Sequence, residues 1–192
     1  MPKPMVILVS GAPGSGKTTL AERIAEELRW PLIYKDAIKE RLHDLLICED
    51  NTRPQKLENA SYGLLYYYVE CQLRAGQSLI VESNFKPNFE TDTLQALQKQ
   101  YDFIALQVFV TAERDVLVER FRERANSEDR HPVHHDEDMV EDFETSLDQN
   151  QYDVMNIDGP VIAVDTTDFE AVDYKALFEE IRTLIKNSPA HP

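Results

Sequence analysis

The chain has 192 residues, of which 42% are hydrophobic and 29% are charged, and this composition indicates a soluble globular protein. Its length suffices for one α/β domain spanning residues 1–192 and excludes two large domains. The formal charge of 20 − 35 = −15 disfavours a long nucleic acid as the main ligand, since proteins of that class carry a basic surface.

The apolar runs have the length of strands, so we expect no membrane-spanning segment and no signal peptide. The two cysteines, Cys48 and Cys71, form neither a disulfide framework nor a metal-binding spacing. They are typical of reduced thiols, and we expect a cytoplasmic protein.

Short apolar runs at residues 5–9, 31–34, 78–82, 103–110 and 160–164 alternate with helical patterns. This alternation predicts an α/β fold, a five-stranded parallel sheet with helices on both faces. The last helical pattern places Leu177, Phe178, Ile181, Leu184 and Ile185 on one face. Ligands of such sheets bind beyond the carboxyl ends of the strands, so we expect the site residues directly after the strands.

The segment after the first strand fits the phosphate-binding loop pattern G-x-x-x-x-G-K-[ST]. Its residues are Gly11, Ala12, Pro13, Gly14, Ser15, Gly16, Lys17, Thr18 and Thr19. Glycines let the backbone approach a phosphate, and the amide groups and the following helix N-terminus attract the anion. We expect Lys17 to contact the β- and γ-phosphates and the Thr18 hydroxyl to bind Mg²⁺. The segment therefore predicts binding of a nucleoside triphosphate.

Asp36 follows the second strand and precedes a helical pattern from Ala37 to Leu46. At the carboxyl edge of the sheet, a carboxylate can accept a proton from an attacking hydroxyl group or hold Mg²⁺. An aspartate at this position can equally be a helix N-cap, and the two roles are compatible.

The third strand ends at Glu82, which can bind Mg²⁺ through water and is a further candidate substrate contact. Ser83, Asn84 and Lys86 follow and could contact a substrate, although an ordinary strand-end turn would look the same. The long segment at about 37–76 is the expected acceptor-binding insertion, in which Arg53 is a candidate substrate contact. Tyrosines 62, 66, 67 and 68 there are more typical of packing.

A helical pattern that begins at Arg114 carries Arg120 and Arg124 near its end, and a polar loop with Arg130 follows. Arginines four residues apart share a helix face, so this segment predicts a lid at about 120–136 that closes over the transferred phosphoryl group. A solvated mixed-charge helix end is the alternative. The seven acids within 136–148 predict a solvated helix face opposite the lid arginines.

His131, His134, His135 and Asp136 could suggest a metal site. Their spacing fits no standard zinc pattern, and no cysteine lies near them. We therefore favour histidines of the lid or its loop.

Together the phosphate loop, Asp36, the polar end of the third strand and the arginine lid resemble the small P-loop kinases. These include gluconate and shikimate kinases, chloramphenicol phosphotransferase, zeta-type toxins and the kinase domain of polynucleotide kinases. More closely, the chain looks like the predicted kinases gathered under an AAA-type ATP-binding domain label. The resemblance covers essentially the whole chain.

The resemblance implies phosphoryl transfer from ATP and Mg²⁺ to a hydroxyl group. Asp36 matches the catalytic base, Arg120, Arg124 and Arg130 fall where the lid arginines fall, and Thr166 lies in a segment similar to the adenine loop. The Asp-x-Asp of shikimate kinases is absent, because Lys35 precedes Asp36 and Ile38 follows it, so the acceptor does not carry over.

We therefore expect a kinase acting on a small hydroxyl-bearing molecule. A nucleoside, nucleotide or polynucleotide 5′-hydroxyl kinase is the alternative within enzymes, and an ATP-binding regulatory switch with slow hydrolysis is the alternative of another class. The sequence leaves open whether the protein is a monomer or a dimer and whether GTP replaces ATP.

Overall fold

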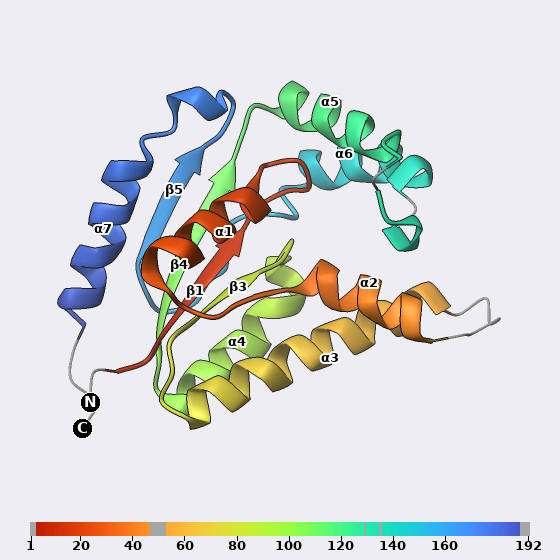
Figure 1. Ribbon diagram of the computed structural model, residues 1–192. Coiled ribbons are helices and arrows are strands. Elements are labelled where there is room, and N and C mark those ends of the chain that lie inside the picture. The colour runs from red at the N-terminus through yellow and green to blue at the C-terminus, as the bar shows by residue number, and fades with distance from the viewer. Residues whose placement is uncertain (1–2, 47–52, 129, 135, 189–192) are drawn as a thin grey trace.

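The computed structural model describes residues 3–46, 53–128, 130–134 and 136–188. Within them, the strands are β1 (Met5–Ser10), β2 (Leu32–Tyr34), β3 (Leu79–Glu82), β4 (Ile104–Thr111) and β5 (Val161–Asp165). They form one sheet in the order β2-β3-β1-β4-β5, and every neighbouring pair is parallel (Figure 1). The predicted five-stranded parallel sheet is thus confirmed, with each strand end within one residue of its predicted position.

The α-helices of the described chain are α1 (Lys17–Leu28), α2 (Lys35–Leu45), α3 (Arg53–Arg74), α4 (Pro87–Tyr101), α5 (Arg114–Ala125), α6 (Val140–Asp148) and α7 (Tyr174–Lys186). Short 3-10 turns lie at η1 (Pro132–His134), η2 (Asp136–Met139) and η3 (Phe169–Ala171). The helix predicted from Ala37 begins earlier, at Lys35, with Tyr34 at its N-cap. Asp36 consequently lies in the first helical turn, and the N-cap alternative is wrong for this residue.

The two faces of the sheet are covered by different helices, because side chains of a strand alternate between faces. Met5, Ile7 and Val9 of β1 pack in a cluster with α1 and α7, including the predicted face residues Leu177 and Ile181. The alternate residues of β1 pack in a second cluster with α3 and α4 (Figure 1). The three-layer arrangement fixes α1, and hence the loop before it, on the buried central strand.

A third cluster joins α5 and α6 to the phosphate loop. Leu117, Val118 and Phe121 of α5 pack with Phe143 of α6 and with Ala12 of the loop. The rings of Phe121 and Phe143 stack with their centroids 4.3 Å apart. The arginine-bearing helix α5 is therefore anchored directly against the loop that is expected to hold phosphate.

Among the described residues, no helix is both long enough and apolar enough to cross a membrane.

Candidate active site

The phosphate loop has a backbone that favours glycine at Gly11, Gly14 and Gly16, and side chains would clash at the first and last of these. Gly11 has φ = 141° and Gly16 has φ = 77°, both in the region that side chains disfavour. A Cβ atom on Gly11 would lie 2.1 Å from the carbonyl oxygen of Val110, and one on Gly16 would lie 2.4 Å from the ring of Phe169. The loop is packed tightly from behind, so its amide groups have one fixed arrangement.

This arrangement suits a polyphosphate. Helix α1 begins at Lys17 without a side-chain cap at Gly16, so the amide groups of its first turn stay available to an anion. The Lys17 side chain is buried, and its Nζ donates to the carbonyl oxygen of Ala12 at 3.2 Å. Burial lowers the pKa of Lys17, while the carboxylates of Glu82 and Asp36 act in the opposite direction.

Oxygen atoms suited to Mg²⁺ lie beside the loop. Thr18 Oγ1 donates to Glu82 Oε2 at 3.0 Å, which joins the first turn of α1 to the end of β3. Burial raises the pKa of Glu82, Lys17 counteracts this, and Asp36 adds to it. A hydroxyl group and carboxylates are the ligands that Mg²⁺ prefers, so Thr18, Glu82 and the nearby Asp36 fit this ion.

Asp36 belongs to a buried ion-pair network. Lys35 Nζ lies 2.9 Å from Asp36 and 2.8 Å from Glu58, and Lys39 Nζ lies 2.9 Å from the other oxygen of Glu58. Burial alone would raise the pKa of Asp36, but Lys35, then His134 and Lys17, outweigh it and hold this pKa well below its usual range. The low pKa favours the charged form of Asp36, close to the loop lysine.

A cavity of about 620 Å³ lies beside the loop and is lined by residues from distant elements. Pro13 of the loop, Asp36, Asn84, Arg124 and Arg130 all line it. Asn84 Oδ1 is buried and has no hydrogen-bond partner among the described residues. The volume is in the range of small-molecule sites, and it extends well beyond the phosphate loop.

Arg124 and Arg130 meet at one buried carboxylate. Arg124 lies 3.2 Å and Arg130 lies 2.7 Å from the same oxygen of Asp136, whose side chain is 8% exposed. Two long cations are thus held at the cavity wall by a single anion.

Arg120 lies apart from these two. It donates to the carbonyl oxygens of Thr166 and Thr167 at 2.9 and 3.1 Å, and its guanidinium group lies 4.1 Å from the centroid of the Phe169 ring. Thr166 was expected at the adenine loop, but its Oγ1 points to the carbonyl oxygens of Ser15 (2.8 Å) and Thr111 (2.9 Å). Its buried hydroxyl supports the phosphate loop from behind.

The chain is similar to known proteins in both sequence and fold. A family model described as "AAA domain" matches residues 6–149. The chain belongs to this AAA-domain family. No curated protein matches the sequence.

Solved structures of several kinases share the fold of this AAA-domain protein. A proposed kinase from Chloroflexus aurantiacus J-10-fl is 35% identical, with a TM-score of 0.84, and the match covers 94% of this chain and 98% of that one. A gluconokinase from Sinorhizobium meliloti 1021 is 19% identical (TM-score 0.59, 97% of each chain). A shikimate kinase from Bacteroides thetaiotaomicron is 19% identical (TM-score 0.56, 95% of this chain and 98% of that one). The fold is that of the small P-loop kinases.

The histidines of the AAA-domain protein make contacts with α2. His134 Nε2 lies 2.7 Å from Glu40, and His131 Nε2 lies 3.0 Å from Asp44, while His135 lies outside the described residues. Burial lowers the pKa of His134, against the opposing effects of Asp36 and Glu40. Among the described residues, side chains that could bind a metal gather at His43, Asp44 and His131, which share only His131 with the four residues considered from the sequence.

Several site residues escaped the sequence analysis. Lys35 and Glu58 belong to no recognised motif and are 23 residues apart, so the sequence gives no signal that they form a pair. Tyr62 lines the cavity with its ring stacked on that of Tyr66, and their spacing of four residues was the available signal. The side chain of Arg53 lies outside the described residues.

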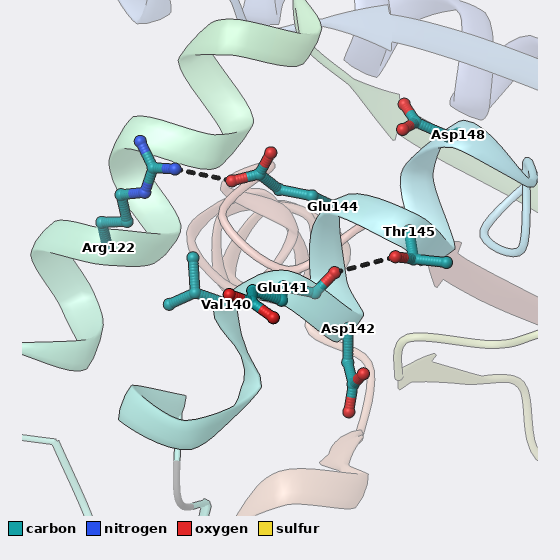
Figure 2. Close-up of a pocket in the computed structure, with 7 residues that line it drawn as sticks. All are labelled: Arg122, Val140, Glu141, Asp142, Glu144, Thr145 and Asp148. Atoms are coloured by element: carbon teal, nitrogen blue, oxygen red, sulfur yellow. Dashed lines mark hydrogen bonds and ion pairs between the residues drawn. The ribbon is translucent and has the colours of Figure 1, made fainter.

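A second hollow, between α5 and α6, has the wrong charge for a polyphosphate (Figure 2). It is lined by Arg122, Val140, Glu141, Asp142, Glu144, Thr145 and Asp148. Its arginine is already bound to Glu144 at 2.6 Å, as the dashed line in Figure 2 shows. The acidic residues of α6 here surround Arg122, which is not one of the predicted lid arginines, and the cavity at the loop remains the candidate site.

Proposed function

We propose that the protein transfers the γ-phosphoryl group of ATP, bound with Mg²⁺, to a hydroxyl group of a small molecule. The observation that carries the proposal is one cavity that borders the phosphate loop at Pro13 and is lined by the half-buried Asp36 and by Arg124 and Arg130. The cavity continues past these groups, which leaves room for an acceptor. The kinase names of the similar structures support the same reaction type.

The donor side is assigned to the loop and its neighbours. The amide groups of residues 11–19 and Lys17 would hold the phosphates, and Thr18 with Glu82 or Asp36 would hold Mg²⁺, in part through water. The ion would neutralise part of the negative charge on the phosphate oxygens. Each of these residues is fixed before ligand arrives, which is the preorganisation that phosphoryl transfer needs.

Asp36 is assigned to the acceptor hydroxyl group. Its low pKa makes it a weak proton acceptor until bond formation to phosphorus has made the hydroxyl proton acidic. Before that point, its negative charge orients the hydroxyl group by accepting its hydrogen bond. Lys35 and Glu58 hold the carboxylate in place for this role.

Arg124 and Arg130 are assigned to the charge on the transferred group, within a lid at about 120–136. The acceptor would enter against the segment at about 37–76, whose Tyr62 lines the cavity. Arg120, because of its contacts with Thr166 and Thr167, is assigned to the nucleotide end of the site. One domain, residues 1–192, would carry all of these parts.

Acceptor-stimulated ADP formation tests the proposal. Purified protein with ATP and Mg²⁺ is supplied with pools of nucleosides, nucleotides, sugars and sugar acids in a coupled ADP assay. We expect one class to raise ADP formation in the wild type and not in Lys17→Ala or Asp36→Asn. If no pool raises the rate above slow hydrolysis, a regulatory ATP switch is favoured instead.

A further inference from the structure

The cations that line the cavity are almost all matched by carboxylates. Lys35 and Lys39 contact Glu58, and Arg124 and Arg130 contact Asp136. Burial normally raises the pKa of Glu58, but the two lysines outweigh it, so this carboxylate is charged and occupied. Pairs of this kind have little attraction left for a charged substrate.

Lys86 is different. It lines the same cavity just before α4, and its Nζ donates to the neutral amide oxygen of Gln151 at 3.1 Å. The same Nζ lies 5.2 Å from the centroid of the Tyr152 ring. No ion pair joins it to a carboxylate among the described side chains. Since an ammonium group has three N–H donors, Lys86 retains donors for a ligand.

A hydrogen-bond acceptor without a partner lies two residues away. Asn84 Oδ1 is buried at the cavity wall and has no hydrogen-bond partner among the described residues. A buried carbonyl oxygen without a donor is unfavourable, and a substrate hydroxyl group would satisfy it. Lys86 and Asn84 are two residues apart in the sequence. They thus offer a cationic donor and a neutral acceptor in one cavity.

We propose that Lys86 binds an anionic group of the phosphoryl acceptor, a carboxylate or a phosphate, while Asn84 accepts a hydrogen bond from one of its hydroxyl groups. The acceptor is then a hydroxylated acid or a phosphorylated polyol. This inference rests on the proposed kinase function. A local cation is necessary for such a substrate, because the chain carries a net charge of −15. Lys86 supplies this cation in the cavity.

Calorimetric titration of the protein saturated with Mg²⁺ and a non-hydrolysable ATP analogue tests the inference. The probes form matched pairs: gluconate against glucitol for the carboxylate arm, and glycerol 3-phosphate against glycerol for the phosphate arm. We expect the anionic member of one pair to bind and Lys86→Met to weaken its binding at least about 10-fold, as for a lost charge-assisted hydrogen bond. Lys99→Met is the matched control, since Lys99 is exposed in the last turn of α4, the helix that Lys86 precedes.

Three results overturn the inference: equal binding of the neutral member, undiminished anion binding in Lys86→Met, or no binding of either anion. Lys86→Gln, which keeps a polar side chain, must weaken binding in the same way, so that a folding defect is separable from loss of charge. Anion binding that depends on Lys86 without any ADP formation would contradict the kinase function and leave the anion site standing. ADP formation with neutral acceptors alone would support the kinase function and contradict the anion site.

Discussion

The two halves of the proposed site are built in different ways. The donor half is one continuous segment, residues 11–19, whose backbone shape is set by glycines and by packing against Val110 and Phe169. The acceptor half is assembled from side chains of α2, α3, α4 and the α6 region, through contacts such as Lys35–Glu58 and Lys86–Gln151. In the proposed site, phosphate recognition would therefore depend on a local segment of the chain, whereas acceptor recognition would depend on tertiary contacts.

The halves also differ in what holds them in place. Backbone geometry and the Thr166 hydroxyl group fix the loop. Ion pairs around Asp36 and Asp136 fix the acceptor half and the arginines. Substitutions in the donor half should abolish nucleotide binding, and substitutions in the acceptor half should alter pH dependence and stability. The following variants test this difference between the two halves.

Gly16→Ala should have the largest effect. The backbone of Gly16 is left-handed, a conformation that a Cβ atom disfavours, and this Cβ would lie 2.4 Å from the Phe169 ring, so the loop or the ring must move. We expect ATP affinity to fall about 100-fold or more, measured by calorimetry. Gly63→Ala is the control, because nothing lies within 4 Å of its Cβ position, and it should bind ATP normally. Normal affinity in Gly16→Ala would show that the loop is not held by this contact.

Asp136→Asn should destabilise the fold by about 3 kcal/mol, because it leaves the partly buried Arg124 and Arg130 without their shared carboxylate. Urea unfolding measures the free energy of unfolding. Asp148→Asn, which removes an exposed partner of Arg114, should leave the unfolding midpoint nearly unchanged. Equal effects of the two substitutions would contradict the special position of Asp136.

Lys35→Met should change the pH dependence of turnover. In the wild type, the low pKa keeps Asp36 charged, so its protonation should not reduce kcat between pH 8 and pH 5, values at least ~1 unit above the usual aspartate pKa. Without Lys35, burial dominates and raises this pKa, and we expect kcat near the low end of that range to fall about 10-fold. Lys39→Met, which leaves the Lys35–Asp36 pair intact, should keep the flat profile. Identical profiles for both variants would rule out Lys35 as the group that holds Asp36 charged.

The charge of Asp36 also contributes to stability. Because folding lowers its pKa, the contribution is present above the usual aspartate pKa of about 4 and is lost as the pH falls below it.

Thr166→Val should have the smallest effect. It removes the hydrogen bond to the carbonyl oxygen of Ser15 and keeps the side-chain shape. Loss of one such bond costs about 1 kcal/mol, so we expect the KM for ATP to rise about 5-fold with kcat unchanged. Steady-state kinetics measure both constants. A fall in kcat with unchanged KM would assign Thr166 to the chemical step instead.

The sequence predicted the parts that depend on neighbours in the chain. Strand positions follow from apolar runs, and the phosphate loop follows from nine consecutive residues between a strand and a helix. Asp36 was found because every strand of a parallel sheet delivers its last residues to the same edge. These rules need no knowledge of tertiary contacts.

The lid arginines show where such rules end. Their spacing placed Arg120 and Arg124 on one helix face, but the long side chains reach different partners, Thr166 in one case and Asp136 in the other. A flexible stem lets a guanidinium group reach several ångströms from its Cα position, so spacing alone does not fix its target. The Lys35–Glu58 pair was likewise invisible, since it depends on how α2 and α3 pack.

Single-turnover transfer from ATP labelled in the γ-phosphate tests the proposed division of the site most directly. The wild type and Asp36→Asn are mixed with labelled ATP, Mg²⁺ and the best acceptor of the screen, and the label is followed into acceptor and inorganic phosphate. We predict that the wild type labels the acceptor and that Asp36→Asn does so about 100-fold more slowly or worse, with unchanged ATP affinity. Equal transfer by both proteins, or label found in inorganic phosphate alone, would contradict an acceptor site built around Asp36.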